Sequence, residues 1–153
     1  MDYSNLIIDT LNVGNTIKLP FVLTPANKSI KTLGKALYLI VDSGASRTSI
    51  TKEVLHGHGY GQYSVSTQQK RTADGFKRFK YTTINGMCIA KEFAFGEMVV
   101  DVLENWDEST VVGVIGLDIL TQLTFITSHK HRKFMLTHKD IPEIDKYFLK
   151  NSI

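Results

Sequence analysis

The stretch Leu39-Ile40-Val41-Asp42-Ser43-Gly44-Ala45-Ser46 places a carboxylate between an apolar run and a turn of small residues. The apolar run, residues 36–41, carries no charge and is typical of a buried β-strand. A carboxylate at the end of such a strand loses solvation, so the charged Asp42 side chain is expected to raise the free energy of the folded state. Conflicts of this kind often mark functional sites. The loop after it can hold one shape, because Gly44 permits a sharp turn and the two serines can hydrogen-bond to nearby backbone.

A second apolar stretch, Val111-Val112-Gly113-Val114-Ile115, follows about seventy residues later. Its lack of charge is typical of a strand through the core. Gly116 then leads into residues 117–123, where we predict a short helix. The Asp-Ser-Gly loop and this strand–glycine–helix segment together resemble the aspartic peptidases, most of all the single-domain retroviral-type (retropepsin) family. The resemblance covers about residues 15–137.

This resemblance implies a mainly all-β fold: a closed, retropepsin-like β-barrel of the acid-protease type with a flap hairpin and one short helix near residues 117–123. We expect residues 1–153 to form a single domain, with its core over about 15–137 and a tail over 138–153. An amphipathic pattern after Pro142 also admits a C-terminal helix over 143–150.

Turn residues and alternating apolar positions predict the remaining elements. Residues 6–8 form an added first strand, and Pro20 marks the strand over 16–23 as an edge strand. Residues 48–55 form a short strand or turn that leads into the start of a helix. The other expected strands are 82–84, 86–90, 93–95 and 98–103, and a hairpin of 123–126 with 133–136.

Asp74-Gly75 between two extended arms predicts a β-hairpin. The resemblance implies that this hairpin folds over the substrate as a flap, with Ala73, Asp74 and Gly75 in contact with it. Two other interpretations remain open. In one, the basic side chains only discourage edge pairing. In the other, the interleaved aromatic residues Phe76, Phe79 and Tyr81 stack on nucleic-acid bases.

Amide hydrolysis by carboxylates needs two of them about 3 Å apart that share one proton, one as general base and one as general acid. The sequence holds a single Asp-Ser/Thr-Gly motif, and neither Asp74 nor Asp118 matches it. One chain therefore carries half of such a site. We expect a homodimer in which two chains meet at a two-fold axis and each gives Asp42. This chemistry needs no metal and no organic cofactor.

By resemblance, Asp42 is the catalytic carboxylate, and Ser43, Gly44 and Ala45 support the active-site loop. Ser43 would bond across the dimer axis, and Gly44 would accept from the backbone of an extended peptide substrate. Ser46 and Arg47 would also contact substrate, but viral enzymes usually carry acidic residues at these positions. The substrate preference of the viral enzymes near the ends of the cleft therefore cannot be carried over to this chain. Arg47 either favours acidic side chains or is simply solvated.

Composition limits the other classes. The chain has 153 residues and a formal net charge of +3, too small to imply a nucleic-acid partner by itself. We find no signal peptide and no apolar run that would span a membrane, so we expect a cytoplasmic protein. We expect its one cysteine, Cys88, to be a packed thiol in an apolar strand. The pairs His56-x-His58 and His129-x-His131 can each begin a zinc site, but no further ligands accompany them, which leaves metal as a minor alternative.

The sequence leaves three hypotheses for the function of the protein. The leading hypothesis is a homodimeric aspartic endopeptidase acting on peptides or proteins. The alternative is a catalytically silent dimer of the same fold that binds peptides or partner proteins, since fold does not fix function. The third, and least favoured, is a nucleic-acid-binding module built on the basic hairpin and residues 129–139.

Overall fold

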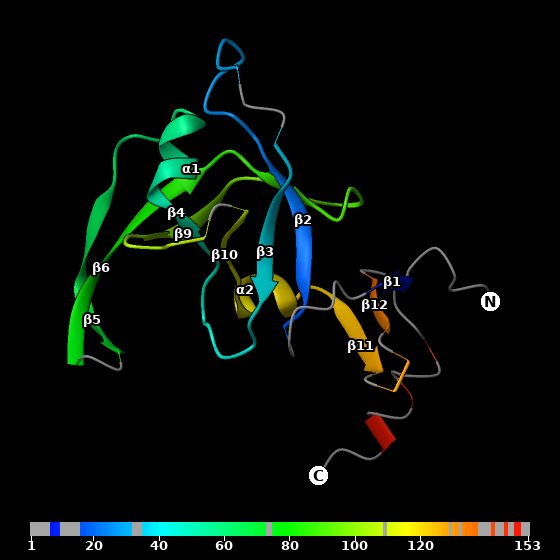
Figure 1. Cartoon of the computed structure of the whole chain (residues 1–153). Helices are drawn as coiled ribbons and strands as arrows, with labels where there is room; N and C mark the ends of the chain where they lie inside the picture. Colours follow the sequence, from blue (N-terminus) through cyan, green and yellow to red (C-terminus); the bar gives the residue numbers. More distant parts are fainter. Residues whose placement is uncertain are drawn as a thin grey trace.

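The computed structural model describes residues 7–9, 16–31, 35–72, 75–108, 110–128, 130–131, 133–137, 142, 146 and 149–150. These residues are mostly β, as the sequence predicts (Figure 1). The strands are β1 (Ile7–Asp9), β2 (Lys18–Leu23), β3 (Leu37–Val41), β4 (Ser49–Thr51), β5 (Ser64–Thr72), β6 (Gly75–Ile84), β7 (Met87–Ile89), β8 (Phe93–Phe95), β9 (Met98–Leu103), β10 (Val111–Ile115), β11 (Thr124–Ser128) and β12 (Lys133–Thr137). The helices are α1 (Lys52–Gly57) and α2 (Leu117–Leu120).

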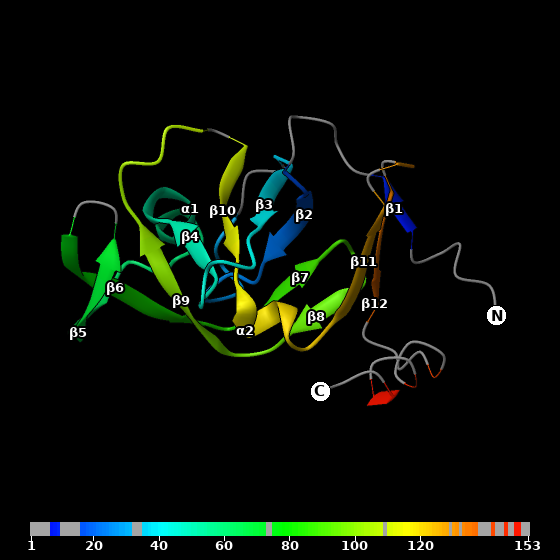
Figure 2. The same ribbon diagram turned by 90° about the horizontal axis from the view of Figure 1, so that it is seen from below.

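The strands form two sheets. Nine strands pair in the order β5-β6-β9-β4-β10-β3-β2-β7-β8, and three more in the order β1-β12-β11. Seen from below, the smaller sheet lies at the opposite end of the molecule from the β5–β6 hairpin (Figure 2). The mainly all-β fold class is confirmed. Pairing among the described residues leaves β5 and β8 at the ends of the order, so closure of the barrel stays a prediction.

Strand β10 lies at the centre of the large sheet. It pairs in parallel with β3 and antiparallel with β4. Val111, Val112 and Ile115 are buried, which explains why the strand carries no charge. Because β3 and β4 flank β10, the loop that joins them, residues 42–48, must pass the end of β10. The motif loop and the start of α2 are therefore brought together by the sheet.

Gly113 allows the close approach of β10 and β4. A Cβ atom at this position would lie 2.0 Å from the backbone oxygen of Ser49. Real Cβ contacts are longer, so the two strands would have to separate.

We expect Gly113→Ala to lower the free energy of unfolding by about 2–3 kcal/mol, because overpacking against backbone cannot relax by a rotamer change. Urea unfolding measures this loss. Gly57→Ala is the matched control, since no atom lies within 4 Å of the added Cβ and alanine is the better helix former. Equal stability of the two variants would contradict the close approach.

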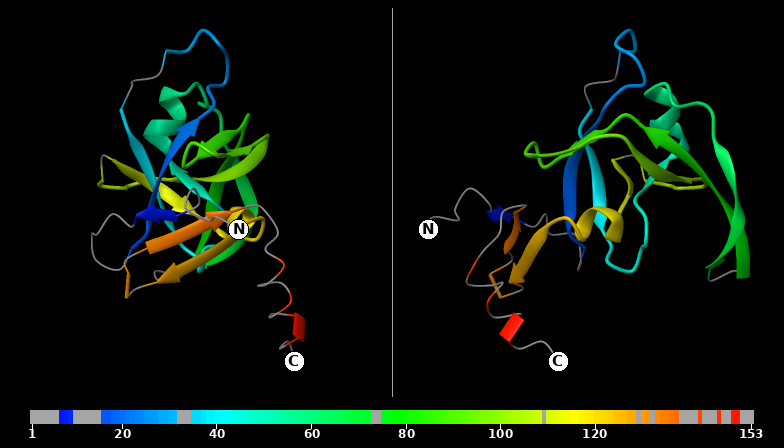
Figure 3. Two further views of the ribbon diagram at one scale, coloured as in Figure 1. Left: turned by 90° about the vertical axis from the view of Figure 1, so that its right-hand side faces the viewer. Right: turned by 180° about the vertical axis from the view of Figure 1, so that it is seen from behind.

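The smaller sheet confirms two further predictions. The hairpin predicted over 123–126 and 133–136 is β11 and β12, whose register pairs Ile126 with Met135. The added first strand is β1, which pairs with β12. Phe134 and Leu136 of β12 are buried in the core. Figure 3 shows this sheet below β2, on the side of the molecule where both described ends of the chain lie.

Some predictions were wrong in detail. Strand β2 is not an edge strand, because it pairs with both β3 and β7. Pro20 is tolerated because the β7 ladder begins only at Phe21. Residues 82–84 do not form a separate strand but end the long strand β6. The helix expected over 117–123 ends at Leu120. By contrast, the short strand that leads into a helix, expected over 48–55, is present as β4 and α1. The expected C-terminal helix lies mostly outside the described residues.

No helix among the described residues is long and apolar enough to cross a membrane.

Candidate active site

Asp42 leaves the end of β3 and is exposed at the start of a tight turn. Its backbone N–H donates to the Ile115 carbonyl oxygen of β10 over 3.0 Å. Its Oδ1 accepts from the Gly44 N–H at 2.9 Å, and its carbonyl oxygen accepts from the Ala45 N–H at 3.1 Å. The carboxylate is thus fixed to its own loop while it faces solvent. A side chain held in this way is available to a reacting group.

The far end of the loop is held by Asp118 of α2. Thr48 is fully buried, and its N–H donates to both carboxylate oxygens of Asp118 at 3.0 Å. The Thr48 hydroxyl donates to Oδ1 at 2.8 Å, and the Ile119 N–H donates to the same oxygen at 2.9 Å. Hydrogen bonds to a charged group are among the stronger ones in proteins. Asp118 therefore positions the loop that carries Asp42.

Gly116 completes this contact between the loop and α2. Its N–H donates to the Thr48 hydroxyl oxygen at 3.1 Å, and the next N–H, of Leu117, donates to the Ala45 carbonyl oxygen at 2.8 Å. A Cβ atom at Gly116 would lie 2.6 Å from the Arg47 carbonyl carbon. Only glycine lets the loop and the helix approach so closely. This explains the strand–glycine–helix pattern of the sequence.

Arg47 joins the loop to two other strands. Its Nη1 donates to Oδ1 of Asp101 on β9 at 3.2 Å. Its guanidinium carbon lies 5.4 Å from the centre of the Phe79 ring on β6, within cation–π range. The Asp101 side chain is 10% exposed and the Arg47 side chain 36%. The Arg47 side chain is thus held from two sides and stays partly exposed, and both interpretations of its role stay predictions.

The predicted hairpin is present as β5 and β6, which pair antiparallel from Ser64↔Tyr81 to Thr72↔Gly75. Gly75 adopts a φ of 107°, which favours glycine. Ala73 and Asp74 lie outside the described residues. The free end of the hairpin and the loop over 42–48 lie on the same side of the molecule in Figures 1 and 3.

An ion-pair cluster ties this hairpin to its surroundings. The Lys80 ammonium of β6 donates to Glu104 over 2.8 Å, and Lys52 of α1 lies 4.0 Å from the same oxygen. Lys80, and to a smaller extent Lys52, lowers the pKa of the Glu104 carboxyl below its ordinary value. The cluster is exposed and contributes little stability. It marks where β6, β9 and α1 meet.

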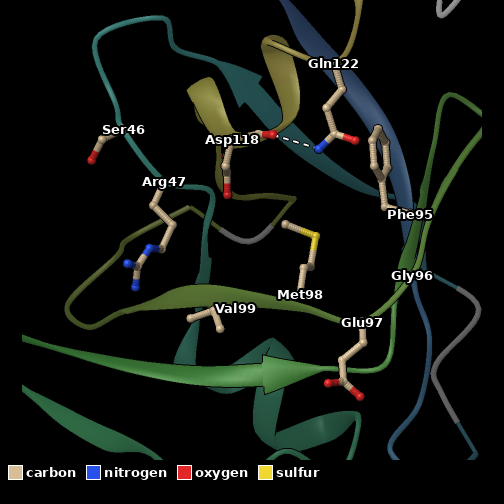
Figure 4. Close-up of a pocket in the computed structure, with 9 residues that line it drawn as sticks. All are labelled: Ser46, Arg47, Phe95, Gly96, Glu97, Met98, Val99, Asp118 and Gln122. Carbon is tan, nitrogen blue, oxygen red and sulfur yellow. Dashed lines mark hydrogen bonds between the residues drawn. The ribbon is translucent and has the colours of Figure 1, made fainter.

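Two open pockets flank the loop. One, of about 460 Å³, lies between the loop, Phe79 and the end of β9. The other, of about 370 Å³, lies between the loop, α2 and the turn before β9 (Figure 4). Ser46 and Arg47 line both pockets. Gly44 and Ala45 line the first pocket, so four of the predicted site residues meet there.

The sequence left metal as a minor possibility at the two His-x-His pairs. Among the described residues, no group of three or more histidine, cysteine, aspartate or glutamate side chains could hold a metal ion. The ring Nδ1 of His58 instead lies 2.7 Å from the Val54 carbonyl oxygen of its own helix. Cys88 is a half-buried free thiol in β7.

Comparison with known proteins agrees with this geometry. The family model described as aspartyl protease matches residues 26–119, and the chain belongs to this family. The structure is similar to the crystal structure of a retropepsin-like aspartic protease from Rickettsia conorii, with a TM-score of 0.58 and 19% sequence identity over 85% of this chain and 95% of that one. A comparison with curated proteins gives no match. The predicted family resemblance is confirmed.

Proposed function

We propose that this chain is an aspartic endopeptidase that works as a homodimer, as one domain with its core over about residues 15–137. The observation that carries the proposal is the exposed Asp42 carboxylate, held by the Gly44 N–H in a loop that Asp118 fixes from the other end. Membership in the aspartyl protease family supports the same chemistry.

In the proposed reaction, the Asp42 carboxylates of two chains face each other across a two-fold axis and share one proton. The ionised carboxylate removes a proton from a water molecule, which attacks the peptide carbonyl carbon. The protonated carboxylic acid donates its proton to the carbonyl oxygen, and the proton that the other carboxylate took from water later passes to the leaving amine. Ser43 supports the pair across the axis, and Gly44 binds substrate backbone. No cofactor takes part.

Substrate would bind in extended form between the loop and the β5–β6 hairpin, as an added strand. In this proposal the hairpin acts as the flap, with Ala73, Asp74 and Gly75 over the peptide, and excludes water when it closes. We also propose that Ser46 and Arg47 contact the substrate, and their place in the lining of both pockets next to the loop supports this role.

The surface near α2 supports association with a second copy. In the described part of the chain, β11 pairs with β12 alone, which leaves its other edge available. Phe125 and Ile126 of β11 are 37% and 41% exposed, and Leu117 of α2 is 41% exposed. An unpaired strand edge with apolar side chains is unusual on a monomer and fits a partner strand.

We expect sedimentation at micromolar concentration to give about twice the chain mass, because one chain carries half of the proposed site. Ile126→Lys should shift the protein to monomer and remove activity together, since the charge would meet its own copy at the interface. Val22→Lys, which changes an exposed apolar side chain of β2 in the other sheet, is the control. A strict monomer that retains activity would contradict the one-Asp-per-chain account.

The direct test is cleavage of a peptide pool by the purified protein, read by mass spectrometry. Defined cleavage products support the peptidase. A dimer that binds peptides but leaves them intact would favour the silent alternative instead.

A further inference from the structure

Arg47 is placed where a substrate side chain would meet it. It follows Asp42 by five positions in the same loop and lines both pockets beside that loop. In Figure 4 its side chain extends from the loop toward β9. A side chain in a substrate strand that crosses the loop would therefore pass the guanidinium group.

The guanidinium is oriented before any substrate binds. Asp101 is buried and accepts from one N–H edge, and the Phe79 ring covers one face of the group. Asp101 is itself fixed, because its backbone N–H donates to the Thr48 carbonyl oxygen at 3.0 Å. An arginine held by a carboxylate and an aromatic ring loses less side-chain entropy when it binds a ligand.

The cation is also the more accessible member of the ion pair. The Arg47 side chain is 36% exposed and that of Asp101 is 10% exposed. A guanidinium has five N–H donors, and among the described residues Asp101 is its one hydrogen-bond acceptor. Among the described residues that line the larger pocket, Arg47 and Asp101 are the two that carry charge. The remaining donors thus give this pocket a positively charged, hydrogen-bond-donating wall.

We propose that Arg47 is a specificity-determining residue, which selects substrates with a glutamate or aspartate side chain at the position that meets it. The inference rests on the proposed peptidase function. A planar carboxylate accepts two parallel N–H bonds from a guanidinium, whereas a glutamine amide accepts fewer and brings no charge. Because the proposed dimer has two Arg47 side chains, the preference falls on two substrate positions, equally distant on either side of the cleaved bond.

A peptide library tests the position of the preference. The wild-type protein should enrich acidic residues at one such symmetric pair of positions. Two matched peptides, with glutamate or glutamine there, then give a ratio of kcat/KM values. We expect glutamate to be favoured roughly five- to tenfold, as for a hydrogen-bonded ion pair at a half-exposed site.

Variants separate recognition from a merely structural role. Arg47→Gln should bring the ratio to about one, while Arg47→Lys should keep part of the preference because the charge remains. Arg78→Gln is the matched control: Arg78 is an exposed arginine next to Phe79 on β6, and its side chain points to the other face of the strand. It should keep the wild-type ratio. The ratio is internal to each enzyme, so a general loss of activity does not change it.

The two failures are distinguishable. If the protein cleaves peptides without an acidic preference, or if Arg47→Gln keeps that preference, the inference is overturned and the peptidase stands. If no peptide is cleaved, the proposed function fails. Fluorescence anisotropy with labelled glutamate and glutamine peptides then still measures the ratio, and equal affinities would overturn the role of Arg47.

Discussion

Asp42→Asn is expected to lower kcat for peptide cleavage by about a thousandfold or more, because asparagine can neither accept nor deliver the proton that the pair exchanges. The fold should survive. The asparagine Oδ1 can still accept from the Gly44 N–H, and the side chain is exposed, so little packing changes. Peptide hydrolysis measures the loss, and thermal unfolding shows that the variant is folded. Asp107→Asn, an exposed aspartate in the loop after β9, is the control.

Mixing the variant with wild type tests whether each site takes one aspartate from each chain. If chains exchange at random and both carboxylates are needed, an equal mixture should keep about a quarter of the activity of wild type at the same total concentration; independent chains would keep about half. The control mixture with Asp107→Asn should keep all of it. Half activity would exclude the shared site even if Asp42 is essential.

Local patterns in the sequence were enough to predict most strands and the motif loop. The charge-free runs around Leu39 and Val112 belong to β3 and β10. Strand β10 is buried on both faces and therefore needs continuous apolar residues. The Asp-Gly signal predicted the β5–β6 hairpin, since the preferences of a tight turn act over a few residues. The motif also predicted that Ser43 to Arg47 lie beside Asp42, because these residues follow it directly in the same short loop.

What the sequence could not show depends on residues far apart in the chain. Asp118 was set aside because it does not follow the Asp-Ser-Gly pattern, yet it binds Thr48, 70 positions away. Arg47 meets Asp101, 54 positions away, and Phe79 from the hairpin. These contacts are set by the order of the strands, which no local pattern encodes. One signal was available: Asp118 stands in the first turn of the predicted helix after Gly116, a place where a carboxylate commonly accepts backbone N–H groups.

Pro20 was misread for the same reason. Proline lacks an N–H group and is usually confined to edge strands, but the structure places β2 between β3 and β7. The ladder with β7 starts one residue later, at Phe21, so the missing donor falls outside it. The Pro20 carbonyl oxygen still accepts from the Ala90 N–H at 2.8 Å. The register of the ladder decides whether a strand position needs an N–H donor, and a proline fits wherever it does not, at the edge of a sheet or inside it.

The contact between Asp118 and Thr48 leads to the second large effect. We expect Asp118→Ala to lower the free energy of unfolding by about 2–4 kcal/mol, because it removes charge-assisted hydrogen bonds and leaves the buried Thr48 N–H without its acceptor. In the fraction that stays folded, kcat should fall about a hundredfold, since the loop that carries Asp42 would shift and small misplacements of a catalytic group are costly.

Asp118→Asn should lie between wild type and Asp118→Ala. Its amide keeps one acceptor oxygen, but the NH2 group would face the Thr48 N–H, donor against donor. Gln122→Ala is the control, because Gln122 is exposed and, within the part of the chain that the structure describes, its side chain donates only to the Asp118 carbonyl oxygen, at 2.8 Å. Its effect should stay within about 0.5 kcal/mol. Urea unfolding and kcat are measured on all three variants. If Asp118→Ala loses stability but keeps full kcat, the carboxylate supports the fold without positioning Asp42, and the loop must be held by the Leu117 N–H and Gly116 contacts alone.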